Sequence, residues 1–214
     1  MELPKHIKGA IFDLDGTLLD SLWIWADIDQ KFLSRRGIEV PPDYMESVCA
    51  MEYRQTAEYT IARFNLKDAP EDLMREWSEM SVSAYENELK LKPGVKEFLS
   101  ELKRKGIKLA VATSATPDMC LPALKRNGVT DMFDAIVTTI EVGKGKAHPD
   151  VYFAAAKKLG VDVSECAVFE DAILAIKTAK NAGFYTIGVY DRFSRDENEI
   201  KAVADGFIEF RVKS

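Results

Sequence analysis

Two short acidic segments could carry chemistry, because each places carboxylates directly after an apolar run. The first is the pentapeptide DLDGT at residues 13–17, which follows the run 7–12. The second is the pair Glu170-Asp171, which follows the run 166–169. Four carboxylates in a small volume repel one another unless a cation neutralises them, and ligand sets made only of oxygen favour magnesium. If the two runs are neighbouring strands, these segments therefore predict a magnesium site.

Each acidic segment also has a simpler interpretation. Asp-rich turns are common, so residues 13–17 alone could be a solvated loop. An acidic pair can instead cap the helix that follows it, which stabilises that helix by a few tenths to ~1 kcal/mol. A calcium EF-hand loop is a poorer fit, because Gly16 stands at the fourth position of the segment and not at the sixth. The two segments together favour the metal site.

Hydroxyl and lysine side chains follow two further apolar runs. The run 108–112 leads into Thr113 and Ser114, whose hydroxyls and main-chain amides could hold a phosphate at a helix N-terminus. For one such pair, an N-cap is the more common role. Lys146 follows the run 135–139 and precedes a predicted helix by a few residues. A surface lysine is usually a solvated charge, but this ammonium could balance a nucleophilic carboxylate against a phosphate dianion.

These runs and the segments between them predict an α/β fold. Besides those named above, a strand is predicted at 185–189. Between the strands, apolar residues recur with helical spacing up to Gly106 and up to Gly160, and Pro117 and Pro149 suit the first turns of helices. Strands that alternate with helices predict a Rossmann-like three-layer core, in which helices cover both faces of a parallel sheet.

Residues 20–90 break this alternation. Two helical patterns occur there without a convincing strand, and a Pro-Gly turn at 93–94 leads back into the α/β pattern. We therefore expect a discontinuous catalytic core, 1–19 with 91–214, and an inserted all-helical cap domain, 20–90. An insert directly after the first strand overhangs the carboxyl edge of the sheet, where open α/β folds bind ligands. A mobile lid is the functional interpretation, and a passive packing module is the simpler one.

The amino-acid composition limits the kinds of molecule that this protein is expected to bind. The 214 residues include 29 basic and 35 acidic side chains, a net charge of −6, which disfavours nucleic acid and anionic membrane surfaces. No run approaches the ~18 apolar residues of a membrane span, and residues 1–9 lack the apolar stretch of a secretory signal, so we expect a cytoplasmic protein. Cys49, Cys120 and Cys166 fit neither a disulfide framework nor a zinc site. The oligomeric state is open, with a monomer as the working expectation.

Taken together, the four segments resemble the haloacid dehalogenase (HAD) superfamily, in its beta-phosphoglucomutase and phosphoglycolate phosphatase-like branch with a helical C1-type cap. The resemblance rests on DLDGT at 13–17, on Thr113, on Lys146 in a Lys-x-x-Pro-Asp setting, and on Glu170-Asp171. These stand in the family's order across essentially the whole chain. The resemblance implies a Mg²⁺-dependent phosphatase of a small phosphorylated metabolite, such as a sugar phosphate or nucleotide, with a covalent aspartyl-phosphate intermediate.

The resemblance also implies a role for each residue. Asp13 would attack phosphorus, and Asp15 would protonate the leaving oxygen and then activate water, which is worth ~10²–10⁴-fold for a well-placed group. Magnesium would be held by the Asp13 side chain, the Asp15 main-chain carbonyl and Asp171. Glu170 would be either a ligand itself or a residue that contacts a ligand. Thr17 would support the loop by hydrogen bonding. Three residues would bind the transferring phosphoryl group: Thr113, Ser114 and Lys146.

Departures from the family pattern bear on the reaction. Dehalogenases lack an acid at the position of Asp15, so this residue argues against them. Beta-phosphoglucomutase-like members carry a His near the start of the cap, where this chain has Trp25. Hydrolysis is therefore favoured, a phosphomutase is the alternative, and a non-catalytic phosphate-ligand binding protein is a remote alternative. Ala172 and Ala175 replace the Ser and Gly that often follow the acidic pair, which bears on the geometry of that loop.

Specificity is expected to come from the cap, where the sequence is less informative. Trp25 could stack on a sugar or a base, although packing inside the cap is the simpler interpretation. Arg54 could reach polar groups of a substrate, although exposed arginines without such a role are common. These two residues are the candidates for substrate specificity.

Overall fold

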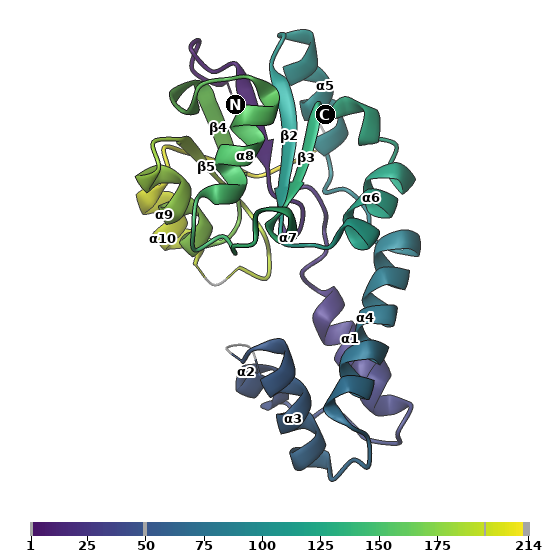
Figure 1. Cartoon of the computed structure of the whole chain (residues 1–214). Coiled ribbons are helices and arrows are strands. Elements are labelled where there is room, and N and C mark those ends of the chain that lie inside the picture. Colours follow the sequence, from purple (N-terminus) through teal and green to yellow (C-terminus); the bar gives the residue numbers. More distant parts are fainter. Residues whose placement is uncertain (1, 49–50, 195, 212–214) are drawn as a thin grey trace. The chain divides into compact units, whose positions relative to one another are not determined.

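Six parallel strands form one sheet in the order β3-β2-β1-β4-β5-β6 (Figure 1). The strands are β1 (Gly9–Phe12), β2 (Lys108–Thr113), β3 (Ala135–Thr138), β4 (Cys166–Glu170), β5 (Tyr185–Val189) and β6 (Gly206–Ile208). The first five coincide with the apolar runs, which confirms the expected parallel α/β sheet. The sixth was not predicted. It is an edge strand of three half-buried residues, too short for a clear apolar pattern.

The strand order changes direction at β1 and β4: successive strands are added on one side of β1 up to β3, and on its other side from β4 onward. The chain runs outward from β1 through β2 to β3, and then crosses back to place β4 on the other side of β1. Ligands of open α/β sheets bind at the carboxyl ends of the strands at such a reversal. The carboxyl ends of β1 and β4 are therefore where this architecture places a site.

Helices cover both faces of the sheet, so the Rossmann-like three-layer core is confirmed. On one face, Ile11 and Val168 share a buried cluster with Tyr152 of α8 (Asp150–Leu159). On the other face, Phe12 stacks on Phe169 at 4.3 Å, and Phe98 of α5 (Val95–Arg104) packs edge-on against both. The helices of this unit are α5 (Val95–Arg104), α6 (Pro117–Arg126), α7 (Thr139–Val142), α8 (Asp150–Leu159), α9 (Ile173–Asn181) and α10 (Glu197–Val203).

The chain divides into two compact units, Met1–Leu22 with Leu89–Ser214, and Trp23–Glu88. The second unit consists of α1 (Ile24–Ser34), α2 (Tyr44–Val48), α3 (Tyr53–Phe64) and α4 (Pro70–Asn87). It has its own core, in which the ring of Phe32 packs edge-on against the buried ring of Trp77 at 5.4 Å. A capping box between Glu52 and Gln55 starts α3, and Pro70 opens α4.

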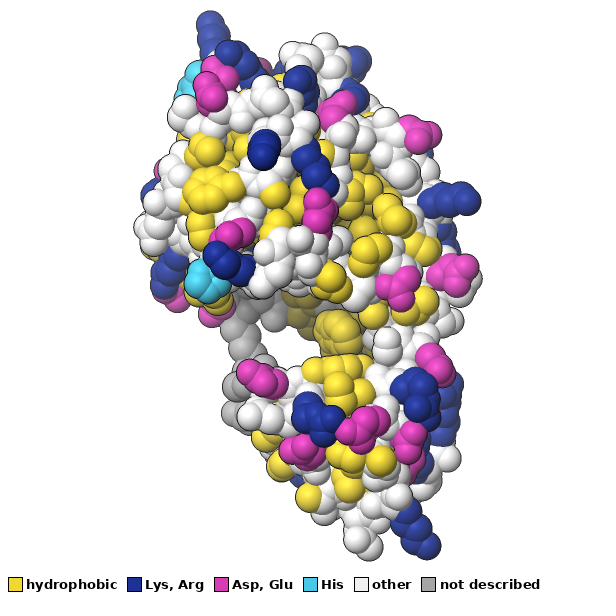
Figure 2. All heavy atoms as spheres, in the orientation of Figure 1, with side chains coloured by type: hydrophobic (Ala, Val, Ile, Leu, Met, Phe, Trp, Pro, Cys, Tyr) yellow, Lys and Arg dark blue, Asp and Glu magenta, His cyan; other side chains and the backbone are white. Residues whose placement is uncertain are grey.

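The computed structural model describes residues 2–48, 51–194 and 196–211. No helix within these ranges is both long and apolar enough to cross a membrane. Cys120 and Cys166 are buried free thiols, whereas Cys49 lies outside the described residues. On the face drawn in Figure 2, Lys and Arg side chains are scattered among Asp and Glu and do not gather into one basic patch.

Candidate active site

The register of β1 against β4 brings the two acidic segments together. Phe12 pairs with Phe169, and the amide of Asp13 donates to the carbonyl of Phe169 at 3.0 Å. Asp13 therefore lies beside Glu170 at the carboxyl edge of the sheet. Side chains along a strand alternate between its faces, so Asp13 and Glu170 follow Ile11 and Val168 toward the face that α8 covers. The condition for a shared site, that the two strands are neighbours, is met.

Three carboxylates form a buried cluster at this edge. One oxygen each from Asp13, Glu170 and Asp171 lies within 4.8 Å of the others, and the residues are 7%, 1% and 8% exposed. Burial, and next the charge of Asp13, raise the pKa of Glu170 to about 7. Burial and the charges of Asp13 and Glu170 raise the pKa of Asp171 well above its usual range. Ionised together, these groups require a positive charge among them.

Lys146 supplies part of that charge. Its Nζ lies 2.5 Å from Oε1 of Glu170 and also forms an ion pair with Oδ1 of Asp13. Burial alone would lower the pKa of Lys146, but the charges of Asp13 and Glu170 and the hydrogen bonds to them outweigh it and raise this pKa. The side chain therefore stays an ammonium. One ammonium cannot balance three carboxylates, and an all-oxygen cluster with excess negative charge fits a hard divalent cation such as Mg²⁺.

The loop after β1 holds the remaining acid of the first segment. The hydroxyl of Ser21 donates to Oδ1 of Asp15 at 2.7 Å, and the amide of Gly16 donates to Ser21 Oγ at 3.2 Å. Thr17 donates to Oδ1 of Asp171 at 3.1 Å, which ties this loop to the second acidic segment. Within the described residues, the side chain of Asp15 is not a member of the carboxylate cluster. The hydrogen bond from Ser21 to Asp15 was not predicted from the sequence.

Position 16 requires a glycine because the two acidic segments lie so close together there. The φ of Gly16 is +71°, in the left-handed region that favours glycine. A Cβ on Gly16 would lie 2.3 Å from Oδ2 of Asp171, so the loop or the Asp171 carboxylate would have to shift to admit it. The absence of a side chain here therefore allows the loop to pass directly beside the carboxylate cluster.

Tyr152 belongs to the site, although sequence analysis placed it only on the apolar face of a helix. Its hydroxyl donates to Oε1 of Glu170 at 2.7 Å, and the residue is fully buried. Burial, and next the charge of Glu170, raise the pKa of Tyr152 well above its usual value, so the phenol remains a donor. The sequence feature that could have pointed to Tyr152 is a tyrosine on the apolar face of a helix, six residues after Lys146. Buried tyrosine hydroxyls generally need a hydrogen-bond partner.

Thr113 and Ser114 lie at the same edge of the sheet but outside this hydrogen-bond network. Because β2 runs parallel to β1 with Val111 opposite Phe12, Thr113 ends β2 one strand away from Asp13. Thr113 is buried, and its Oγ1 accepts from the amide of Ala115 at 2.9 Å. Ser114 is exposed. Within the structure described, Thr113 thus shapes the turn before α6, while its neighbour presents a hydroxyl to solvent.

The two specificity candidates lie in the helical unit and differ in their surroundings. Trp25 is 43% exposed and lines a pocket of about 370 Å³ together with Tyr53 and Trp77. Arg54 does not line that pocket. Its guanidinium is paired with Glu71 at 2.5 Å and with Glu58 at 3.6 Å. Arg54 is therefore already engaged by acids of its own unit.

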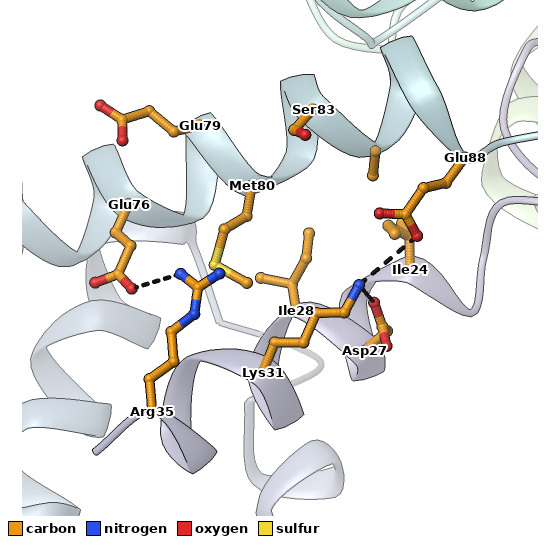
Figure 3. A pocket seen from close by; sticks show the side chains of 11 residues that line it. Ile24, Asp27, Ile28, Lys31, Arg35, Glu76, Glu79, Met80, Ser83 and Glu88 are labelled. Carbon is orange, nitrogen blue, oxygen red and sulfur yellow. Dashed lines mark hydrogen bonds and ion pairs between the residues drawn. The ribbon is translucent and has the colours of Figure 1, made fainter.

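A second pocket of about 270 Å³ lies between α1 and α4 (Figure 3). Lys31 in this pocket is paired with Asp27 at 2.7 Å and with Glu88 at 3.6 Å. Arg35 is paired with Glu76 at 3.3 Å. Among its described lining residues, both basic groups are thus already neutralised, which makes it a poor site for a phosphate. The carboxyl edge of the sheet, where Lys146 faces the carboxylate cluster, is better suited to phosphate chemistry than this pocket.

Comparison with known proteins gives consistent matches. The family model of haloacid dehalogenase-like hydrolases matches residues 10–189. A phosphorylated carbohydrates phosphatase of Thermotoga maritima is 29% identical over 181 residues, 85% of this chain and 84% of its own length. Hexitol phosphatase A of Escherichia coli K12 is 31% identical over 184 residues, which are 85% of this chain and 82% of its own length. A solved structure of a candidate beta-phosphoglucomutase of Thermotoga maritima, 27% identical, covers 95% of this chain and 94% of its own with a TM-score of 0.85.

Proposed function

The chain belongs to the haloacid dehalogenase-like hydrolase family and is a phosphatase, and we propose that it hydrolyses a small sugar phosphate or similar phosphomonoester through an aspartyl-phosphate intermediate, with Mg²⁺ as cofactor. The observation that carries the proposal is the ion pair of Lys146 with Asp13 inside a buried cluster of three carboxylates. The names of two relatives, a phosphatase of phosphorylated carbohydrates and a hexitol phosphatase, support a sugar phosphate as substrate.

In the first half of the proposed reaction, Asp13 is the nucleophile. A carboxylate oxygen of Asp13 attacks phosphorus, a new P–O bond forms, and the bond from phosphorus to the ester oxygen breaks. Asp15 donates its proton to the departing oxygen, so that the organic group leaves as an alcohol. The hydrogen bond from Ser21 to Asp15 supports this assignment, because it restricts the carboxyl group that must deliver the proton.

In the second half, water hydrolyses the phosphorylated Asp13. Asp15, now a carboxylate, takes a proton from the water as its oxygen attacks phosphorus, and the P–O bond to Asp13 breaks. The products are inorganic phosphate and Asp13 in its original form. Each residue returns to its starting protonation state, so the cycle balances without another reactant.

The proposed reaction also requires positive charge close to the phosphoryl group. Mg²⁺ would supply a double positive charge that offsets the phosphate and the carboxylates together. It would be held by Asp13, Asp171 and the main-chain carbonyl of Asp15. Glu170 would be a further ligand or a residue that contacts one. Three residues would bind the transferring group: Thr113, Ser114 and Lys146.

We also propose that residues 20–90 act as a cap that selects the substrate, inserted into a core of residues 1–19 and 91–214. Trp25 is the better supported of the two specificity candidates, because it is half-exposed in an aromatic pocket. Arg54 is less well supported, since its guanidinium already pairs with Glu71.

A phosphomutase is the second candidate, and the similarity to a candidate beta-phosphoglucomutase structure is the observation that favours it. A mutase would convert a hexose 1-phosphate into the 6-phosphate and would depend on a bisphosphate primer. A phosphatase would release free sugar and inorganic phosphate in equal amounts. Product analysis with glucose 1-phosphate therefore separates the two reactions.

The proposal is tested by measuring phosphate release from a panel of sugar and polyol phosphates, with Mg²⁺ and with excess EDTA. We expect release that needs Mg²⁺ and that is abolished in Asp13→Asn. A protein inert to the whole panel, or an Asp13→Asn variant as active as the wild type, would overturn the proposal. Stable binding of phosphate esters without turnover would revive the non-catalytic interpretation.

A further inference from the structure

Two buried donors converge on a single oxygen of Glu170. The ammonium of Lys146 lies 2.5 Å from Oε1, and the hydroxyl of Tyr152 donates to the same atom at 2.7 Å. Glu170 is 1% exposed and Tyr152 is 0% exposed, so solvent competes with neither bond. No side chain among the described residues donates to Oε2. The two oxygens of this carboxylate therefore have different surroundings.

Tyr152 is the more rigid of the two donors. It lies in the first turn of α8, within the cluster that packs against Ile11 and Val168, and its ring packs edge-on against Phe184 at 6.0 Å. A tyrosine has two rotatable side-chain bonds and is held here by packing on its ring. Lys146 reaches the same oxygen from a loop on a flexible four-carbon stem. The position of Oε1 is thus defined more firmly by the tyrosine.

We propose that Tyr152 is a positioning residue, whose hydroxyl holds Glu170 with Oε1 against Lys146 and leaves Oε2 available to the carboxylate cluster. By this means Tyr152 sets the affinity of the cluster for Mg²⁺ and keeps Lys146 beside Asp13. The inference rests on the metal site of the proposed function. Hydrogen-bond partners of metal-binding groups typically change metal affinity or activity about 10–100-fold when they are removed.

Tyr152→Phe tests the proposal, because it deletes the hydroxyl and keeps the packed ring. The affinity for Mg²⁺ is measured by titration calorimetry on the full chain without substrate. We expect binding about 10-fold or more weaker than in the wild type. We also expect that saturating Mg²⁺ restores most of the lost kcat, because the variant retains the cluster itself. Should Tyr152→Phe fail to fold, Tyr152→Met provides a second side chain without a hydroxyl, and the same expectation applies to it.

Tyr44→Phe is the matched control. Tyr44 is also fully buried, and its hydroxyl bonds Oγ1 of Thr60 at 2.7 Å within the helical unit. We expect both variants to lose a similar amount of thermal stability, but only Tyr152→Phe to lose Mg²⁺ affinity. An unchanged Mg²⁺ affinity in Tyr152→Phe would show that the tyrosine only packs, and would overturn the inference alone. A wild type that binds no Mg²⁺ would overturn the proposed metal site itself.

Discussion

The ammonium of Lys146 lies 2.5 Å from Oε1 of Glu170, where the two side chains are 14% and 1% exposed. The same ammonium pairs with Asp13, so one cation joins the ends of β1 and β4. Buried ion pairs are costly to break, because the partner that remains is a buried charge without compensation. Lys146 is therefore an electrostatic support of the cluster, and in the proposed reaction it would also bind the phosphoryl group.

Replacing Lys146 by Met should reduce kcat/KM by about 10²-fold or more, since one preorganised charge at the reacting group is lost. Lys144→Met is the control, because Lys144 forms an exposed pair with Asp150 at 3.0 Å, and such pairs contribute about 1 kcal/mol or less. Steady-state kinetics of phosphate release measures both variants. Equal activity of Lys146→Met and Lys144→Met would contradict the prediction.

Gly16→Ala should disrupt the carboxylate cluster, because the new Cβ would lie 2.3 Å from Oδ2 of Asp171. Gly37→Ala is the matched control, with a φ of +70° against +71° and no atom within 4 Å of a Cβ. A left-handed backbone costs each alanine about 1–2 kcal/mol. We expect both melting temperatures to fall, and Mg²⁺ affinity and activity to fall only in Gly16→Ala. Retained Mg²⁺ affinity in Gly16→Ala would show that the loop can shift away from Asp171.

Mg²⁺ affinity should weaken as the pH falls below about 7. Burial and the charge of Asp13 raise the pKa of Glu170 to about 7, and the pKa of Asp171 is raised as well. A carboxyl group must lose its proton to bind a metal, so protons compete with Mg²⁺ increasingly as the pH falls. For one displaced proton, the apparent Kd rises about tenfold per pH unit. Calorimetry near pH 6 and pH 8 measures this, and equal Kd values would contradict it.

Asp29→Asn should stabilise the protein at alkaline pH. Burial raises the pKa of Asp29 from 3.8 to about 7, and no described side chain pairs with it. The folded state thus holds this proton more tightly than the unfolded state, so stability falls as the pH rises from about 4 to about 7. One pKa unit is about 1.4 kcal/mol, so we expect a gain of about 1–3 kcal/mol near pH 8 and little near pH 4.

Denaturant unfolding at the two pH values measures the effect of Asp29→Asn. Asp27→Asn is the control on the same helix, because its carboxylate pairs with Lys31 at 2.7 Å. We expect this control to lose about 1 kcal/mol or less. A gain in Asp29→Asn that is the same near pH 4 and pH 8 would rule out a buried charge as its cause.

Local sequence pattern was sufficient to predict most of the elements of the core. Five apolar runs became strands, and Gly160 ends α8 with a φ of +62° as expected. These features depend on residues near one another in the chain, through periodicity and the conformational freedom of glycine. The strand β6 was missed for the same reason, because three half-buried residues carry too little local signal.

The sequence by itself determined that carboxylates stand at the ends of two strands and that a lysine and hydroxyl groups follow two others. Only the tertiary structure decided that β1 and β4 are neighbours, which places Glu170 beside Asp13, and that Lys146 reaches Asp13 from a loop 133 residues further along the chain. It also decided that the buried phenol of Tyr152 takes Glu170 as its acceptor, and that Arg54 pairs with Glu71. The physical reason is that periodicity reports which face of an element is buried, whereas the partner of a polar group is chosen by packing between distant segments.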